Sequence, residues 1–168
     1  SGAGMLGVAA CAMLKSAGAR RILAVDVDEH RLDTAWRFGA DATFLVGAKD
    51  APQPVDTVFE FSGAPAAMES TLSLVDIGGT AVWVGATFPQ PLLRVDAEHV
   101  VRSLITIKGL HNYRAGDLAE AVRFMESRYD AYPLGELVTC EFNLNEINKA
   151  LGYALSSRAY RVGVRICE

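Results

Sequence analysis

The sequence has 168 residues, of which 51% are hydrophobic, and its formal net charge at pH 7 is -4. A chain of this length and composition can bury a substantial core and fits one domain with a smaller appendage. Its lysines and arginines are scattered among acidic residues, which argues against a basic surface for phosphate backbones. Nucleic acid is therefore excluded as an expected partner.

The spacing of the cysteines and the length of the apolar segments indicate the cellular compartment of the protein. Cys11, Cys140 and Cys167 lie far apart and form no C-x-x-C pair or Cys/His cluster with zinc-ligand spacing. No apolar run approaches the roughly 18 residues that span a bilayer, and no segment resembles a signal peptide. We expect a reduced cytoplasmic protein with no membrane partner and no metal site inside this chain. Because the chain begins with Ser, we also expect a piece of a longer polypeptide.

Strand-like and helix-like segments alternate from the N-terminus onward, which predicts an α/β domain with a parallel sheet. An Ala-rich helix is expected over about 5–17, followed by a buried strand over 21–27. Asp28 has the character of an N-cap for a second helix, which ends near Gly39. The next strand is expected over 43–46.

The segment GAKDAPQP at 47–54 is too short and too rich in proline for a helix, so an extended crossover is expected there. It leads to a strand over 55–61 and a helix over about 65–75. The glycines at 78 and 79 are expected to stop that helix, and a strand follows over 80–85.

The pattern of expected elements changes in the last third of the chain. A short helical turn over 97–102, a strand over 104–109 and an amphipathic helix over 116–127 are followed by a strand, a helix and a strand, expected over 137–144, 145–155 and 160–166. We therefore predict two domains, 1–132 and 133–168.

Gly2, Gly4 and Gly7 form a G-x-G-x-x-G pattern that opens the first helix. In a dinucleotide-binding unit the first glycine makes a tight turn, the second admits the pyrophosphate, and the third allows close packing of the helix. The helix N-terminus supplies free N–H groups and a partial positive charge to the phosphates. The pattern alone is weak, because methyltransferases carry similar loops.

Asp26 strengthens this interpretation. It closes the strand that follows, 19 residues after Gly7. There it would accept hydrogen bonds from the adenosine ribose and repel a 2'-phosphate, which favours NAD over NADP. The alternative is a strand-end residue that only caps the next helix. Asp28 is better placed for capping, which would leave Asp26 free.

Several segments together resemble the cofactor domain of the medium-chain, zinc-type alcohol and polyol dehydrogenases. The segments are, in chain order, GAGMLG, VDVDEHRLDTAWRFGADA, FEFSG, GGTAVWVG and LITIKG, and the end of the chain resembles the return of that family into its catalytic domain. The resemblance implies a doubly wound Rossmann fold with strand order 3-2-1-4-5-6. The first strand of that sheet is missing here, so a slot is expected between strands 21–27 and 55–61. The HNY sequence at His111 resembles the branch associated with phosphonate catabolism.

The resemblance also implies which residues bind the cofactor. Pyrophosphate would be bound by Gly2, Gly4, Met5, Leu6 and Gly7. The adenosine side would involve Asp26, Arg31, Phe61, Ser62 and Gly63. The nicotinamide end would involve Val84, Gly85, Ala86, Leu110 and His111, and a phosphate would be bound by Arg161. Val84, Phe61, His111 and Arg31 have a plain alternative as core, structural or solvated helix residues.

The implied activity is hydride transfer between a primary or secondary alcohol and NAD, with zinc held only in a catalytic portion outside this chain. The chain alone is expected to be inactive, and the parent protein is expected to be a homodimer or homotetramer through the edge strand 104–109. Three alternatives are a zinc-free quinone or enoyl reductase, a methyltransferase and a non-catalytic NAD-binding module.

Overall fold

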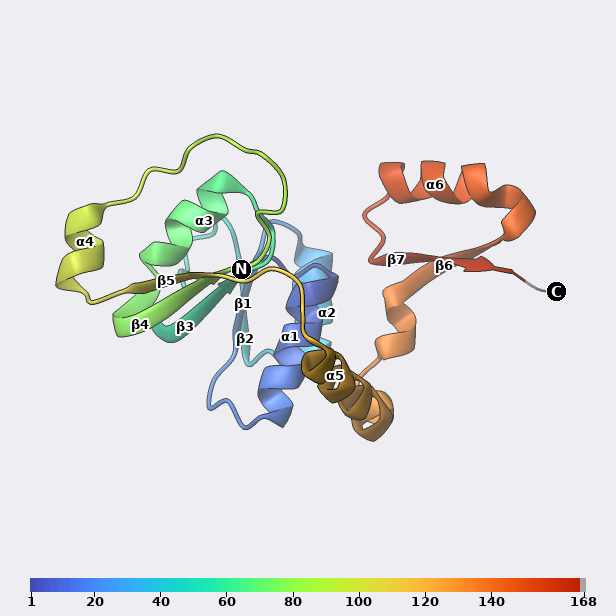
Figure 1. Ribbon diagram of the computed structural model, residues 1–168, viewed down its shortest axis with the longest axis horizontal. Coiled ribbons are helices and arrows are strands. Elements are labelled where there is room, and N and C mark those ends of the chain that lie inside the picture. The colour runs from blue at the N-terminus through green and yellow to red at the C-terminus, as the bar shows by residue number, and fades with distance from the viewer. Residues whose placement is uncertain (167–168) are drawn as a thin grey trace. The chain divides into compact units, whose positions relative to one another are not determined.

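The computed structural model describes residues 1–166, so Cys167 lies outside the described residues. The chain divides into two compact units, Ser1–Val122 and Arg123–Glu168 (Figure 1). No helix within residues 1–166 is long and apolar enough to cross a membrane.

The first unit alternates strands and helices, as the sequence pattern predicts. Its elements are α1 (Met5–Ser16), β1 (Leu23–Asp26), α2 (Glu29–Arg37), β2 (Ala42–Leu45), β3 (Val55–Glu60), α3 (Pro65–Leu72), β4 (Val75–Trp83), α4 (Ala97–Arg102), β5 (Thr106–Gly109) and most of α5 (Ala115–Arg128). The crossover at 47–54 contains no helix or strand.

All strand pairs of this unit are parallel. β1 pairs with β2 from Leu23↔Ala42 to Asp26↔Leu45. β3, β4 and β5 form a second sheet in that order, in which Glu60 lies opposite Trp83. Parallel strands end at the same edge, so the loops after β3, β4 and β5 lie next to one another. The mixed α/β fold with parallel sheets is confirmed.

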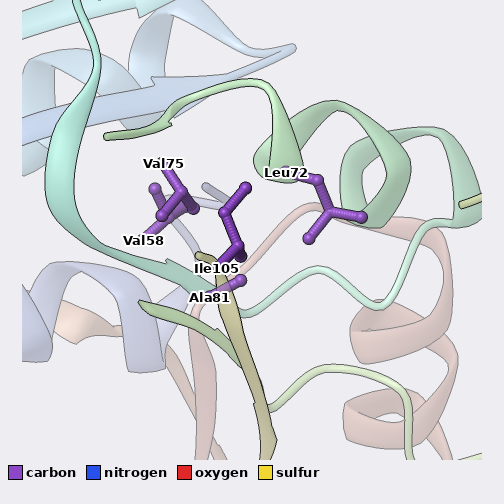
Figure 2. Close-up of a cluster of buried hydrophobic side chains, with 5 residues drawn as sticks. All are labelled: Val58, Leu72, Val75, Ala81 and Ile105. Atoms are coloured by element: carbon purple, nitrogen blue, oxygen red, sulfur yellow. The ribbon is translucent and has the colours of Figure 1, made fainter. Parts of the chain in front are cut away.

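The core of the second sheet lies under α3. Figure 2 shows Val58, Val75, Ala81, Leu72 and Ile105 pointing toward one another from β3, β4, α3 and the segment before β5. All are buried, with Ala81 fully so. Burying an aliphatic side chain of this size stabilises a fold by about 1.5–3 kcal/mol. This cluster fixes the sheet whose strand ends carry the candidate site.

The region around Val75 differs from the sequence-based expectation. The helix expected to reach residue 75 ends at Leu72, and β4 begins at Val75, which pairs with Val55. The two glycines therefore lie inside a strand. Gly78 has a φ of +77°, and a Cβ placed on Gly79 would lie 2.6 Å from the Asp56 carbonyl oxygen. They allow an irregular, close approach of two strands and do not end the helix.

A cavity of about 430 Å³ lies between β1 and β3, where the slot was expected. In the described part of the chain β1 pairs only with β2, and β3 only with β4. Each strand therefore has an open edge that faces the cavity. Ala10, Cys11 and Leu14 of α1 also line it.

One end of this cavity is closed by the first two residues. The Ser1 nitrogen donates to the Phe59 carbonyl at 2.8 Å, and the Phe61 N–H donates to the Ser1 carbonyl at 2.9 Å. Gly2 N–H donates to the Val25 carbonyl at 2.8 Å on the other side. Ser1 therefore bonds to the two neighbours of Glu60, which is the pattern of a parallel ladder.

The second unit contains two parallel strands and a helix. β6 (Val138–Asn143) pairs with β7 (Arg161–Arg165), and α6 (Ile147–Ser156) connects them. The rings of Phe142 and Tyr153 lie 5.9 Å apart. The expected strand, helix and strand are all present, and the expected functional boundary after residue 132 stays a prediction.

Candidate nucleotide-binding site

The glycine loop has the backbone geometry that its sequence predicts. Gly2 adopts a φ of +83°, which side chains disfavour, so it makes the tight turn. A Cβ on Gly7 would collide with the Gly2 carbonyl oxygen. The close contact of the third glycine is thus with the loop itself, and a larger residue would push the loop away from α1.

The N-terminus of α1 is available to an anion. Its N-cap is Gly4, and among the described residues no side chain caps this helix. Met5 is half-buried and Leu6 is 54% exposed in the first turn. Uncapped N–H groups at a helix N-terminus are a favourable site for phosphate.

Asp26 is buried beside this loop, and both of its carboxylate oxygens accept hydrogen bonds from the backbone. One carboxylate oxygen accepts a hydrogen bond from Ala3 N–H at 2.6 Å, and the other accepts from Asp28 N–H at 3.0 Å. Asp28 caps α2, as predicted, by accepting from His30 N–H at 3.0 Å. Each Asp26 oxygen keeps capacity for a further donor, such as a hydroxyl. Asp26 thus connects the glycine loop to the end of β1.

Arg31 lies on the same side of the loop. Its Nη1 is 3.8 Å from the position that a Cβ on Gly4 would occupy. The structure therefore brings a guanidinium next to the second glycine, although α2 starts more than 20 residues further along the chain. A positive charge there favours anions near the helix N-terminus.

The loop after β3 packs against the glycine loop. A Cβ on Gly2 would lie 2.9 Å from Ser62 N. Gly63 has a φ of +70°, and a Cβ on it would collide with the Gly85 carbonyl. The Phe61 ring stacks on Phe59 at 6.0 Å. The predicted residues Phe61, Ser62 and Gly63 thus form a turn that lies between the glycine loop and the loop after β4.

Glu60 is a residue of this site that sequence reasoning missed. It is fully buried, and its carboxylate accepts hydrogen bonds from Ser62 and Gly63. The available signal was an acidic residue between two phenylalanines at the end of an apolar strand, directly before Ser-Gly. A charge in that position must be paired or hydrogen-bonded to be tolerated.

Four of the five residues expected at the nicotinamide end line one cavity of about 390 Å³ at the ends of β4 and β5. Val84, Ala86, Leu110 and His111 line it, together with Met68, Trp83, Thr87 and Gly109. The buried Trp83 indole nitrogen has no hydrogen-bond partner in the described structure. Gly85 packs against Gly63 in the neighbouring turn.

Arg161 belongs to the second compact unit. It lies at the start of β7, is exposed, and donates from Nη1 to the Tyr160 carbonyl at 2.9 Å. The structure therefore does not bring Arg161 together with the glycine loop inside one unit.

The described residues offer no group of three or more His, Cys, Asp or Glu side chains that could hold a metal ion. Cys11 is buried, and burial raises the pKa of its thiol. A thiol with a raised pKa stays protonated and is a poor ligand.

The comparisons with known proteins agree with this geometry. A family model described as zinc-binding dehydrogenase matches residues 6–127, and the chain belongs to this family. The resemblance to zinc-type medium-chain dehydrogenases is thereby confirmed. The chain is 30% identical to the L-threonine 3-dehydrogenase of Streptomyces coelicolor over 172 residues, which is 96% of this chain and 49% of that protein.

Two solved structures share the fold. An alcohol dehydrogenase from Thermotoga maritima matches with a TM-score of 0.88 at 25% identity, covering 97% of this chain and 48% of that one. An alcohol dehydrogenase from Escherichia coli, solved with NADH, matches with a TM-score of 0.81 at 16% identity, covering 97% and 49%. The chain spans about half the length of these relatives.

Proposed function

We propose that the chain is the NAD-binding part of a dehydrogenase that transfers hydride between a primary or secondary alcohol and NAD. The observation that carries the proposal is the glycine loop at the open N-terminus of α1, with the buried Asp26 bonded to it. Membership of the zinc-binding dehydrogenases supports it.

The residues of the site fit a dinucleotide. A Cβ on Gly2 or Gly7 would meet backbone atoms, which keeps the loop tight, and the uncapped helix end suits a pyrophosphate. Asp26 and Arg31 would hold the adenosine ribose, and the cavity beside Val84 and His111 would hold the nicotinamide. Bound NAD would supply the hydride acceptor, while these residues bind and orient it.

Zinc does not fit the described residues of this chain, so we derive no step through it. We propose that zinc, if the parent protein binds it, is held outside this chain. The segment 133–168 would then serve the catalytic domain, and the chain without that domain would be inactive. The substrate class is proposed as an alcohol or a carbonyl compound, and both the phosphonate-catabolism branch and a cytoplasmic location stay predictions.

The alternatives have less support. The zinc-free quinone or enoyl reductase shares the fold, but the family model that matches is that of zinc-binding dehydrogenases. The same match argues against a methyltransferase. A non-catalytic NAD-binding module would carry the same site, so only turnover by the full-length protein separates it from an enzyme.

The proposal is tested by Asp26→Ser in the full-length protein. A serine cannot accept from both Ala3 and Asp28 and carries no charge to repel a 2'-phosphate. We expect weaker NAD binding and a smaller preference for NAD over NADP, measured by calorimetry. Asp28→Ser is the matched control, because serine still caps α2. An unchanged preference in Asp26→Ser would contradict the assignment.

We also propose that β5 forms a contact between two copies. Ile107 of β5 is 37% exposed, and Leu104, two residues before the strand, is 69% exposed, at the edge of the described sheet. An apolar edge with open backbone groups pairs readily with another chain. Ile107→Lys should lower the mass of the full-length protein in solution, whereas Val46→Lys, at another exposed position, should not. An unchanged mass for Ile107→Lys would place the contact elsewhere.

A further inference from the structure

The side chain of Glu60 is fully buried at the end of β3 and is the most buried acidic group of the described structure. Its Oε1 accepts from Ser62 N–H at 2.8 Å and from the Ser62 hydroxyl at 2.5 Å, and its Oε2 accepts from Gly63 N–H at 2.9 Å. Both oxygens are therefore engaged by the turn that follows the strand.

This arrangement requires a carboxylate of this length. Oxygen acceptors are needed at both ends of the group, because the Ser62 and Gly63 N–H groups both donate. A glutamine would offer one oxygen and would present an NH₂ group to one of the donors. These donors are partly buried, and the loss of their acceptor would destabilise the turn, so the turn would rearrange.

The turn held by Glu60 contacts two other loops. Ser62 packs against Gly2, since a Cβ on Gly2 would lie 2.9 Å from Ser62 N. Gly63 lies against Gly85 so closely that a Cβ on either would collide with the other residue's backbone. A displacement of the turn would therefore move the glycine loop, the loop after β4, or both.

The main chain of the same residue makes the third connection. The Glu60 carbonyl accepts from Val84 N–H at 2.9 Å and from Gly85 N–H at 3.0 Å. Side chain and backbone of one residue thus fix the turn at 61–63 and the loop at 84–86. The Phe61 N–H, one residue on, donates to the Ser1 carbonyl.

We propose that Glu60 is a positioning residue for the dinucleotide: its buried carboxylate holds the turn at 61–63 and so sets the spacing between the glycine loop and the Val84–Ala86 loop. The proposal rests on the proposed NAD-binding function. Glu60 acts through Ser62 and Gly63, and its buried oxygens are already occupied by these donors.

The first test compares Glu60→Gln with Thr71→Val in the full-length protein. Thr71 is equally buried, and its hydroxyl donates a hydrogen bond to the Met68 carbonyl within α3. We expect Glu60→Gln to lower NAD affinity at least tenfold by calorimetry at a temperature where both variants are folded. Thr71→Val should bind NAD within twofold of the parent. Equal NAD affinity in Glu60→Gln and the parent would overturn the proposal.

A second pair of variants changes only exposed serines, Ser62 and Ser70. Ser62→Ala removes the hydroxyl that donates to Glu60 and accepts from the Ala64 N–H, at an exposed position, but keeps both backbone donors to Glu60. It should lower NAD affinity by roughly threefold, and in the double variant with Glu60→Gln it should add less than it does alone. Ser70→Ala is the control, since Ser70 is an exposed serine of α3 that bonds only within its helix among the interactions described. Independent effects of Ser62→Ala and Glu60→Gln would contradict the shared role.

Hydrogen exchange separates this inference from the proposed function. If the parent protein does not bind NAD, the proposed function fails, yet the Ser62 and Gly63 amides should still exchange faster in Glu60→Gln than in the parent. Unchanged exchange at these two amides would overturn the positioning role, whatever the ligand.

Discussion

The two ends of β1 and β3 are held very differently. At their carboxyl ends, Ser1 and Gly2 bond to both strands, and the carboxylates of Asp26 and Glu60 fix the loops that follow. Along the rest of their length the same strands face a cavity of about 430 Å³. The candidate site is therefore connected by hydrogen bonds, whereas the sheet beneath it is interrupted.

The geometry of the site and the stability of the fold therefore depend on different interactions. The geometry of the loops follows from the hydrogen bonds that join them and from the close packing of Gly2, Gly7, Gly63 and Gly85. Stability depends mainly on buried apolar area, and the open edges of β1 and β3 contribute little of it. Changes in the cavity should thus affect stability first, and changes at the strand ends should affect binding first.

The largest effect is expected from filling the cavity. An extended apolar segment of about five residues, joined to Ser1, would bury side chains against α1 and pair with both strands. The gain from burial minus the cost of ordering is on the order of 3 kcal/mol, which corresponds to a rise of roughly 6–12 °C in the unfolding midpoint. Calorimetry on the 168-residue chain with and without the segment measures it. A Gly/Ser segment of equal length should give no rise, and equal midpoints for both segments would show that the cavity accepts no strand.

A smaller effect on stability, with a large effect on binding, is expected for Gly7→Ala. The new Cβ would collide with the Gly2 carbonyl, which costs about 1–3 kcal/mol in a tightly packed position. NAD affinity of the full-length protein should fall as the loop moves away from α1. Gly116→Ala in α5, where a Cβ meets nothing within 4 Å, should instead stabilise by about 0.5–1 kcal/mol. Normal NAD affinity in Gly7→Ala would show that the loop is not fixed.

The smallest effect is expected at the amino end of β1. Lys15 of α1 donates to Asp41, and Ile22 N–H donates to the other oxygen, so that these bonds hold the pKa of Asp41 below its ordinary value. A lowered pKa in the folded state contributes stability above the unfolded value of about 3.9 and loses it as the pH falls through the folded value.

Asp41→Asn should therefore destabilise the chain at pH 7 by a few tenths of a kcal/mol to about 1 kcal/mol, as is usual for partly exposed pairs. The difference from the parent should shrink below about pH 4, measured by urea unfolding. Asp33→Asn, at an exposed position of α2, is the control. A difference that is the same at pH 3 and pH 7 would contradict the role of the charge.

Much of the fold follows from the sequence because its signals are local. The N-cap at Asp28, the α4 turn and the crossover at 47–54 depend on neighbouring residues, and all agree with the structure. Val75 was expected in a helix because glycines usually end helices. Its pairing with Val55 depends on a distant strand, which no local pattern contains.

The candidate site also has one part that the sequence predicts and one part that it does not. The glycine spacing and Asp26 are visible in the sequence, because the dinucleotide pattern is short and periodic. The bonds from Asp26 to Ala3 and from Glu60 to Gly63 depend on which side chains become buried. Burial is a property of the assembled sheet, so the acidic residue between two phenylalanines marks Glu60 as unusual but does not show which donors it accepts from.

The ladder bonds of Ser1 also determine an alignment. Ser1 lies opposite Glu60, so the residue two positions before Ser1 in any strand joined to it would lie opposite Val58 and face the cluster under α3. The residue directly before Ser1 would face α1 instead. Inserting a single residue at this junction would exchange the two faces of such a strand, and every apolar side chain on it would point to the wrong layer.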